Sequence, residues 1–191
     1  YEYHSMRRNI IVAKKALSSE VCEQIIQGAK NNFVKGGIGE SKIDKEIRDS
    51  ETCFLDGIMS HYNLYKPILE LATHVNNKFY QFNILHPETL QVTKYDEKNK
   101  GFYKPHMDQG YDVAPNVSVR KLSMSIQLTP PEYYEGGQLE FPDDKHNFVE
   151  EDAREQGTAI FFPSYLQHGV QPVTKGIRYS LVSWFVGPSF K

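Results

Sequence analysis

The residues best suited to chemistry in this 191-residue sequence are a histidine and an aspartate two positions apart, with a second histidine later in the chain. Side chains at positions i and i+2 of an extended strand point to the same side. His106 and Asp108 are therefore predicted to reach one metal ion together, while Met107 faces away. His168 follows the apolar stretch Ala159–Pro163 and is the candidate third ligand.

This ligand set favours iron. Two imidazoles and one carboxylate on one face of an octahedron leave three positions open, which is the arrangement of non-haem Fe(II) oxygenases. Zinc also accepts these ligands, but hydrolytic zinc sites usually have a positioned general base. The sequence contains no helical zinc-protease motif.

A second group of useful residues lies shortly after His168. Arg178, Ser180 and Trp184 alternate along a run of strand-forming residues and are predicted to share one face. The guanidinium of Arg178 offers a bidentate fork for a carboxylate, which the Ser180 hydroxyl can also bond. A structural salt bridge is the alternative for a lone arginine, because a buried arginine needs a partner. The closeness to His168 favours a carboxylate-bearing cosubstrate.

The elements that must position these residues are mainly short strands. Beyond about residue 89, strand-forming runs alternate with turn residues, which is typical of a sandwich or a closed barrel. The predicted strands are Asn9–Ala13, Thr89–Tyr95, Pro105–Gln109, Leu122–Thr129, Gln138–Phe141, Thr158–Phe162, Gly169–Pro172 and Arg178–Val186.

Two helices are expected before this β region. The first is capped by Ser18 or Ser19 and ends at the glycines that begin with Gly36. The second runs from about His61 to Tyr80. Its predicted buried stripe consists of Tyr65, Ile68, Leu69, Ala72, Val75 and Phe79.

The stretch Leu122–Thr129 alternates between apolar and polar side chains. Its polar face is predicted to carry Ser123, Ser125, Gln127 and Thr129. Solvent on that face is one explanation. The other explanation is a barrel interior that holds a polar ligand. The alternating pattern alone does not distinguish the two explanations.

Two stretches are candidate flaps over a site. Gly36–Ser50 is charged and rich in glycine, and it is expected to be a mobile surface loop; Gly110–Val119 is the second stretch. Plain surface connections are an equally good explanation of both.

Composition limits the class of protein. The formal net charge of -2 provides no basic field to attract nucleic acid. The two cysteines have no metal-type spacing and favour a reducing compartment. No apolar run reaches the roughly 20 residues that span a bilayer. A cytoplasmic location without a membrane or nucleic-acid partner is therefore expected, although a start at Tyr1 is compatible with a trimmed targeting segment. The oligomeric state stays open.

Several motifs occur in the order found in a known family. Gly101–Asp108, Gly136–Phe141, Gly157–Pro163 with His168–Val170, and Gly176–Phe185 together resemble the prolyl 4-hydroxylase branch of the Fe(II)- and 2-oxoglutarate-dependent dioxygenases. The resemblance covers the last half of the chain. It implies a double-stranded β-helix (jelly-roll or cupin-like) core over 89–191, with an N-terminal helical support over 1–88 in one domain.

The resemblance also implies roles for individual residues. His106, Asp108 and His168 would bind iron, and Arg178 would pair with the C5 carboxylate of 2-oxoglutarate. Tyr95, Ser180 and Gln127 would complete the cosubstrate pocket, although relatives often have tyrosine where this chain has Gln127. Trp184 and Tyr103 are candidate substrate contacts, and core packing is the alternative for Trp184.

The implied reaction is hydroxylation of a C–H bond with O2, releasing succinate and CO2. The expected substrate is a prolyl residue in a peptide or protein, of the procollagen-proline type, with ascorbate as a candidate further cofactor. A small-molecule or free amino-acid hydroxylase is the first alternative, and a non-enzymatic metal-binding jelly roll is the second. Oxygenases of nucleic-acid bases carry a second arginine at the position of Trp184, so that class is disfavoured.

Overall fold

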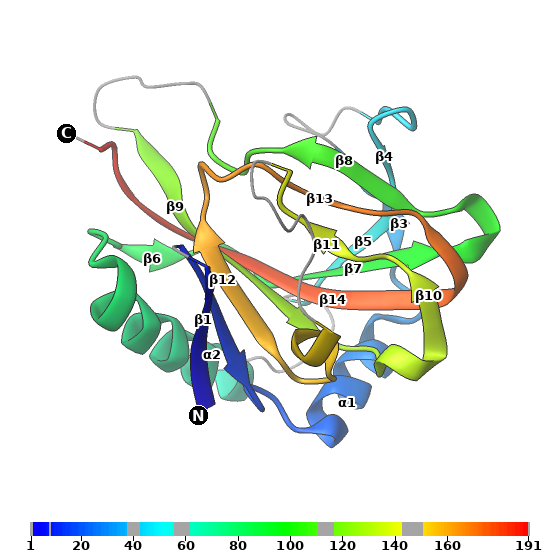
Figure 1. Ribbon diagram of the computed structural model, residues 1–191, viewed down its shortest axis with the longest axis horizontal. Helices are drawn as coiled ribbons and strands as arrows, with labels where there is room; N and C mark the ends of the chain where they lie inside the picture. Colours follow the sequence, from blue (N-terminus) through cyan, green and yellow to red (C-terminus); the bar gives the residue numbers. More distant parts are fainter. Residues whose placement is uncertain are drawn as a thin grey trace.

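The computed structural model describes residues 2–7, 9–37, 43–55, 62–110, 117–142 and 151–190. Within them the chain forms two β-sheets, with the helices gathered on the far side of the larger sheet (Figure 1). This arrangement confirms the mostly β, jelly-roll fold with flanking helices.

The larger sheet forms the backbone of the molecule. Its strands follow the order β1 (Glu2–Arg7), β2 (Ile10–Lys14), β12 (Ala159–Pro163), β9 (Ser118–Gln127), β14 (Val173–Pro188), β7 (Gln91–Asp96), β5 (Glu51–Phe54) and β3 (Val34–Lys35). Two short strands, β6 (His86–Pro87) and β10 (Tyr134–Gly136), also pair with β14. Residues before position 89 thus contribute strands to this sheet as well as helices.

The smaller sheet covers one face of the larger one. Its order is β11 (Leu139–Glu140), β13 (His168–Val170), β8 (Phe102–His106) and β4 (Arg48–Asp49). Strand β8 starts earlier than the predicted strand Pro105–Gln109 and ends at His106, so Asp108 lies just beyond it.

Two helices pack on the opposite face of the larger sheet. They are α1 (Ser19–Ala29) and α2 (Tyr62–Val75), which continues as a π-helical turn η2 (Asn76–Tyr80). Three short 3-10 turns complete the described elements: η3 (Glu97–Asn99), η4 (Pro131–Tyr133) and η5 (Glu151–Arg154). Ser18 caps α1 by accepting a hydrogen bond from the Val21 amide at 3.3 Å.

Two expectations about the helices were wrong. Helix α1 ends at Ala29, before the Gly36 cluster, because the chain turns there toward β3. Leu69 of α2 and Phe79 of η2 are 41% and 37% exposed, whereas Leu71 of α2 is 2% exposed. The buried stripe is narrower than predicted because it follows Ile68, Leu71, Ala72 and Val75 at helical spacing, which leaves Leu69 at its margin.

Strand β9 shows why the sheet is buried on both faces. Its apolar side chains Leu122, Met124 and Ile126, together with Leu128 just after the strand, join the core beneath the helices. Its polar side chains Ser123, Ser125 and Gln127 are also buried, on the face toward the smaller sheet. The polar face is therefore part of the barrel interior rather than a solvent-exposed surface.

The two candidate flaps are only partly described. The Gly36–Ser50 stretch directly follows β3, and its last residues include β4, which corrects the expectation of a plain surface loop. Residues 38–42 and 111–116 lie outside the described part. None of the helices described is long and apolar enough to span a membrane.

Candidate active site

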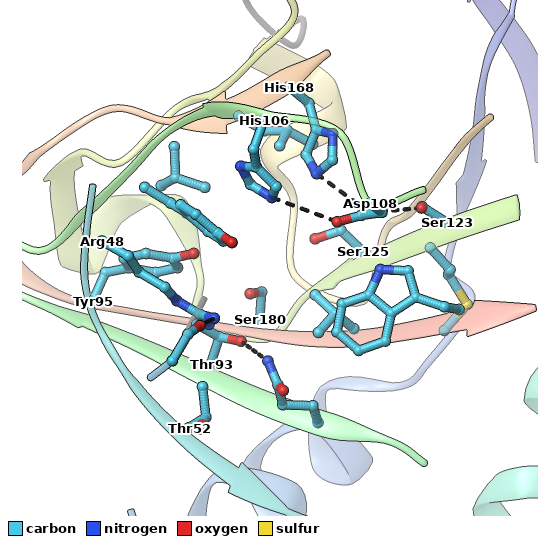
Figure 2. Close-up of a pocket in the computed structure, with 18 of the residues that line it drawn as sticks. Arg48, Thr52, Thr93, Tyr95, His106, Asp108, Ser123, Ser125, His168 and Ser180 are labelled. Carbon is cyan, nitrogen blue, oxygen red and sulfur yellow. Dashed lines mark hydrogen bonds and ion pairs between the residues drawn. The ribbon is translucent and has the colours of Figure 1, made fainter. Parts of the chain in front are cut away.

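A cavity of about 520 Å³ lies between the two sheets. Figure 2 shows His106, His168 and Asp108 at one end of it, opposite Thr93 and Ser180 at the other. The strands bring these residues together from distant parts of the sequence, and β13 pairs directly with β8 so that His168 lies beside His106.

The metal-ligating end is compact. The ligand atoms of His106, Asp108 and His168 all lie within 4.8 Å of one another. The two Nε2 atoms of the histidines approach different oxygens of Asp108, at 3.5 Å for His106 and 3.4 Å for His168. Two imidazole nitrogens and a carboxylate that converge in this way can hold a divalent metal ion on one face.

Backbone carbonyls orient both imidazoles. Nδ1 of His106 lies 2.9 Å from the Lys104 carbonyl oxygen, and Nδ1 of His168 lies 3.0 Å from that of Leu166. Since a carbonyl only accepts, each Nδ1 carries the proton, and each Nε2 presents its lone pair to the site. Burial lowers the pKa of His168, partly countered by Asp108, which favours the neutral ligand form.

Asp108 is held as a carboxylate. Burial alone would raise its pKa, but the neighbouring His168 and His106 and the hydroxyl of Ser123 bring the pKa below its usual range. The Ser123 hydroxyl donates to Asp108 Oδ2 at 2.7 Å. Ser164 lies 2.9 Å from Ser123 and must be the donor there, because the single Ser123 proton is already used.

The opposite end of the cavity is built around Arg178, which is 1% exposed. Its Nη2 donates to the Gln127 side-chain oxygen at 3.0 Å. Its Nε and Nη1 are buried and have no hydrogen-bond partner within the described residues. A fixed guanidinium with two open donors suits a carboxylate, since leaving it unpaired is costly.

Other predicted pocket residues surround Arg178. The Arg178 guanidinium lies 5.6 Å from the centre of the Tyr95 ring, and Ser180 lines the same cavity. Burial raises the pKa of the Tyr95 hydroxyl, partly offset by Arg48 and Arg178, so that hydroxyl stays a neutral hydrogen-bond donor. Gln127 bonds Arg178 itself and thereby orients the guanidinium.

The two candidate substrate residues lie on different walls of the cavity. The Tyr103 ring stacks on His106, with ring centres 3.6 Å apart. Trp184 is half-buried beneath the guanidinium of Arg120, whose carbon lies 3.8 Å from the ring centre. Both residues line the cavity, so Trp184 is more than a core side chain.

Sequence reasoning missed two residues that line the cavity, Arg48 and Ser123, and Glu88, which pairs with the cavity residue Arg120. Arg48 is buried in its wall, although its segment reads as a surface loop. Ser123 bonds Asp108, and the alternating pattern of β9 marked it only as one of several polar residues. Glu88 forms a bidentate pair with Arg120, with a closest contact of 2.6 Å. No local motif marks Glu88 or Arg48.

Comparisons with known proteins point the same way. Residues 90–186 match the family model described as the 2OG-Fe(II) oxygenase superfamily. A PKHD-type hydroxylase of Aliarcobacter butzleri is 35% identical over 127 residues, which is 64% of this chain and 54% of the relative. One of Alteromonas mediterranea is 41% identical over 71 residues, which is 37% of this chain and 30% of the relative. The chain thus spans about half or less of these curated relatives.

Solved structures share the fold. A viral collagen prolyl hydroxylase from Paramecium Bursaria Chlorella virus-1 superposes with a TM-score of 0.72 at 20% identity, covering 94% of this chain and 96% of that one. A Pseudomonas putida prolyl-4-hydroxylase gives 0.71 at 18% identity, covering 95% and 94%. With the family model extending over half of its length, the chain belongs to the 2OG-Fe(II) oxygenase superfamily.

Proposed function

We propose that this chain hydroxylates a prolyl residue of a peptide or protein, using Fe(II), 2-oxoglutarate and O2. The observation that carries the proposal is one cavity with a His-Asp-His cluster at one end and a buried arginine with open donors at the other. Residues 1–191 would then form a single catalytic domain.

His106, Asp108 and His168 are the residues that would hold the iron. The Nε2 atoms of the two histidines and the Asp108 carboxylate already face one another, so binding of the metal ion requires little rearrangement. When bound, Fe(II) and 2-oxoglutarate activate O2 to oxidise a C–H bond and yield succinate and CO2. The chain supplies geometry, charge neutralisation and exclusion of water.

Arg178 would bind the distal carboxylate of 2-oxoglutarate. Its Nε and Nη1 are free to donate, while Gln127 fixes the guanidinium through Nη2. Ser180 and Tyr95 would add neutral hydroxyl donors from the same wall. Charge-assisted bonds of this kind are roughly twice as strong as neutral ones.

The part of the cavity between Tyr103 and Trp184 would receive the substrate. Aromatic rings make favourable contacts with the apolar ring of proline. Two of the structural neighbours are named as prolyl hydroxylases of collagen and of a hypoxia-inducible-factor peptide fragment, which supports a peptide substrate for this chain. Procollagen-type sequences are the finer proposal, and ascorbate is proposed as the reductant that maintains the iron.

Turnover assays test the proposal. The purified protein would be incubated with Fe(II), ascorbate and 2-oxoglutarate, with or without a proline-rich peptide, and succinate would be quantified. We expect peptide-stimulated succinate and a hydroxylated proline in the peptide by mass spectrometry, and neither product with the alanine-substituted peptide. If the protein neither bound 2-oxoglutarate nor formed succinate, the proposed 2-oxoglutarate-dependent activity would be excluded.

A further inference from the structure

We propose that Arg48 forms a second anion-binding position in the cavity, which recognises a carboxylate of the substrate rather than of 2-oxoglutarate. This inference rests on the proposed function. It assigns a role to a buried cation that neither the metal cluster nor Arg178 requires.

Arg48 is built into the cavity wall. It belongs to the two-residue strand β4 and pairs across the sheet with Tyr103 on β8. The side chain is only 8% exposed overall, yet it lines the cavity, where Figure 2 shows it on the same side as Tyr95. Its guanidinium carbon lies 4.6 Å from the centre of the Tyr103 ring.

The local bonds of Arg48 fix its direction. Nε donates to Ser50 Oγ at 2.6 Å, and Nη1 donates to the Gly37 carbonyl at 2.7 Å. A Cβ at Gly36 would lie 2.9 Å from Nε, so the backbone just after β3 packs closely against this side chain. Within the described residues Nη2 has no hydrogen-bond partner, and it is the group left to meet a ligand.

The charges around the cavity separate Arg48 from its neighbours. Two other cations that line it are paired, since Lys35 lies 3.2 Å from Asp49 and Arg120 lies 2.6 Å from Glu88. Arg48 and Arg178 have no carboxylate partner in the described part of the chain. One buried guanidinium matches the distal carboxylate of 2-oxoglutarate, which leaves the other uncompensated.

The position of Arg48 points to the substrate. The Tyr103 ring lies between Arg48 and His106, stacked on the imidazole on one side and beneath the guanidinium on the other. A substrate residue that meets the remaining edge of the Tyr103 ring therefore brings its neighbouring groups close to Arg48. A carboxylate there would be bound by a charge-assisted hydrogen bond in a site of low dielectric.

Two sources supply such a carboxylate: an acidic side chain beside the target residue, or the substrate's own terminal carboxylate. Four peptides with both termini blocked test proline recognition and carboxylate recognition separately. They carry Pro or Ala at the target position and Glu or Gln beside it. A fifth carries Pro, Gln and a free C-terminal carboxylate directly after the proline. Dissociation constants would be measured by fluorescence anisotropy on protein loaded with Mn(II) and 2-oxoglutarate.

For the wild type we expect about tenfold tighter binding, about 1.4 kcal/mol, of a carboxylate-bearing peptide over its Gln counterpart. Preference for Glu assigns the side chain as the source, and preference for the free-acid peptide assigns the terminus. Arg48→Gln should reduce the ratio of the two dissociation constants (Gln peptide over carboxylate peptide) to about one, whereas Arg48→Lys should keep part of this preference. Lys35→Gln removes a cavity cation that is already paired and should keep the full ratio.

Three results would overturn the assignment. They are equal binding of all carboxylate and Gln peptides by the wild type, an unchanged ratio in Arg48→Gln, or a loss of 2-oxoglutarate affinity in that variant as large as the loss of the ratio. If Arg48→Gln does not fold, the assignment is still tested by the binding of the five peptides to the wild-type protein and to Arg48→Lys. Discrimination of Pro from Ala tests the proposed function separately, so a carboxylate preference without a proline preference would sink the substrate class but keep the Arg48 site.

Discussion

The two ends of the cavity differ in how far the protein satisfies its own polar groups. At the metal-ligating end, both Nδ1 atoms are bonded to carbonyls, and Asp108 accepts from Ser123. At the arginine end, two N–H groups of Arg178 are buried without a partner within the described residues. The first end is arranged before any ligand arrives, while the second depends on a ligand to complete it.

This difference teaches where binding energy is expected. Preformed ligand atoms give a metal site its affinity and selectivity, because the chain has already ordered them. A buried unpaired guanidinium is instead a standing cost that a carboxylate relieves, so 2-oxoglutarate binding should depend strongly on Arg178. Variants at each end should therefore fail in different ways.

The largest effect is expected at the metal end. His168→Ala removes one of three ligand atoms, so 2-oxoglutarate turnover should fall by more than the roughly 10- to 100-fold caused by losing a supporting hydrogen bond. Turnover and Mn(II) affinity, measured by calorimetry, would check this. A variant that kept full activity would remove His168 from the metal site.

The next effect is expected at the arginine end. Arg178→Met should weaken 2-oxoglutarate binding by about 2–5 kcal/mol, the usual cost of removing one partner of a buried charge pair. When the 2-oxoglutarate concentration is about 100 times its dissociation constant, the wild-type protein should gain about 2.7 kcal/mol of stability, visible as a higher melting temperature. Arg178→Met should not show that gain at the same concentration.

Arg120→Gln is the matched control for Arg178→Met. Arg120 also lines the cavity but is paired with Glu88, so its loss should leave the stabilisation by 2-oxoglutarate intact. Equal losses in both variants would mean that cavity charge in general, rather than Arg178, attracts the cosubstrate.

A smaller effect tests the supports of the metal end. Ser123→Ala removes the hydrogen bond to Asp108 and should lower Mn(II) affinity by roughly 10- to 100-fold. Ser125→Ala changes the next residue on the same strand face, which lines the cavity without bonding Asp108, and should have little effect. If the two variants lost affinity equally, the Ser123 bond would have no special role.

The smallest effect tests the packing of the arginine end. Gly137 has a φ of +63°, and a Cβ there would lie 3.0 Å from Arg178 Cδ. Gly137→Ala should cost about 1–2 kcal/mol of unfolding free energy from the left-handed backbone, and it should weaken 2-oxoglutarate binding a few-fold. Gly157→Ala, with a φ of +81° and a Cβ close to the Leu17 backbone, should lose stability without affecting the cosubstrate. Unchanged cosubstrate affinity in Gly137→Ala would contradict the close packing.

Strand periodicity accounts for the part of the cavity that could be predicted. Arg178, Ser180 and Trp184 were expected on one face because strand side chains alternate, and all three line the cavity from β14. The alternation in β9 left two explanations for its polar face. The smaller sheet covers that face of β9 and thereby makes it a polar interior. A local sequence pattern does not predict which strands pair into such a sheet.

Long-range pairing explains what could not be predicted. Arg48 lies in a glycine-rich, charged stretch that reads as a surface loop, yet β4 pairs with β8 and buries it beside Tyr103. The end of β8 at His106 also differs from the predicted strand, because the chain leaves the sheet there and Asp108 turns toward Ser123. Leu69 was misplaced because a wide helical stripe does not reveal which part of it meets the sheet.

The central claim is that one cavity binds a metal ion and 2-oxoglutarate together, through the histidine–aspartate cluster and Arg178. Calorimetric titration of 2-oxoglutarate into the wild type, Arg178→Met and His168→Ala, each with and without Mn(II), tests it most directly. We predict one-to-one binding that is tight only in the wild type with metal, and weak without metal or in either variant. Equally tight binding to metal-free protein or to Arg178→Met would contradict the account.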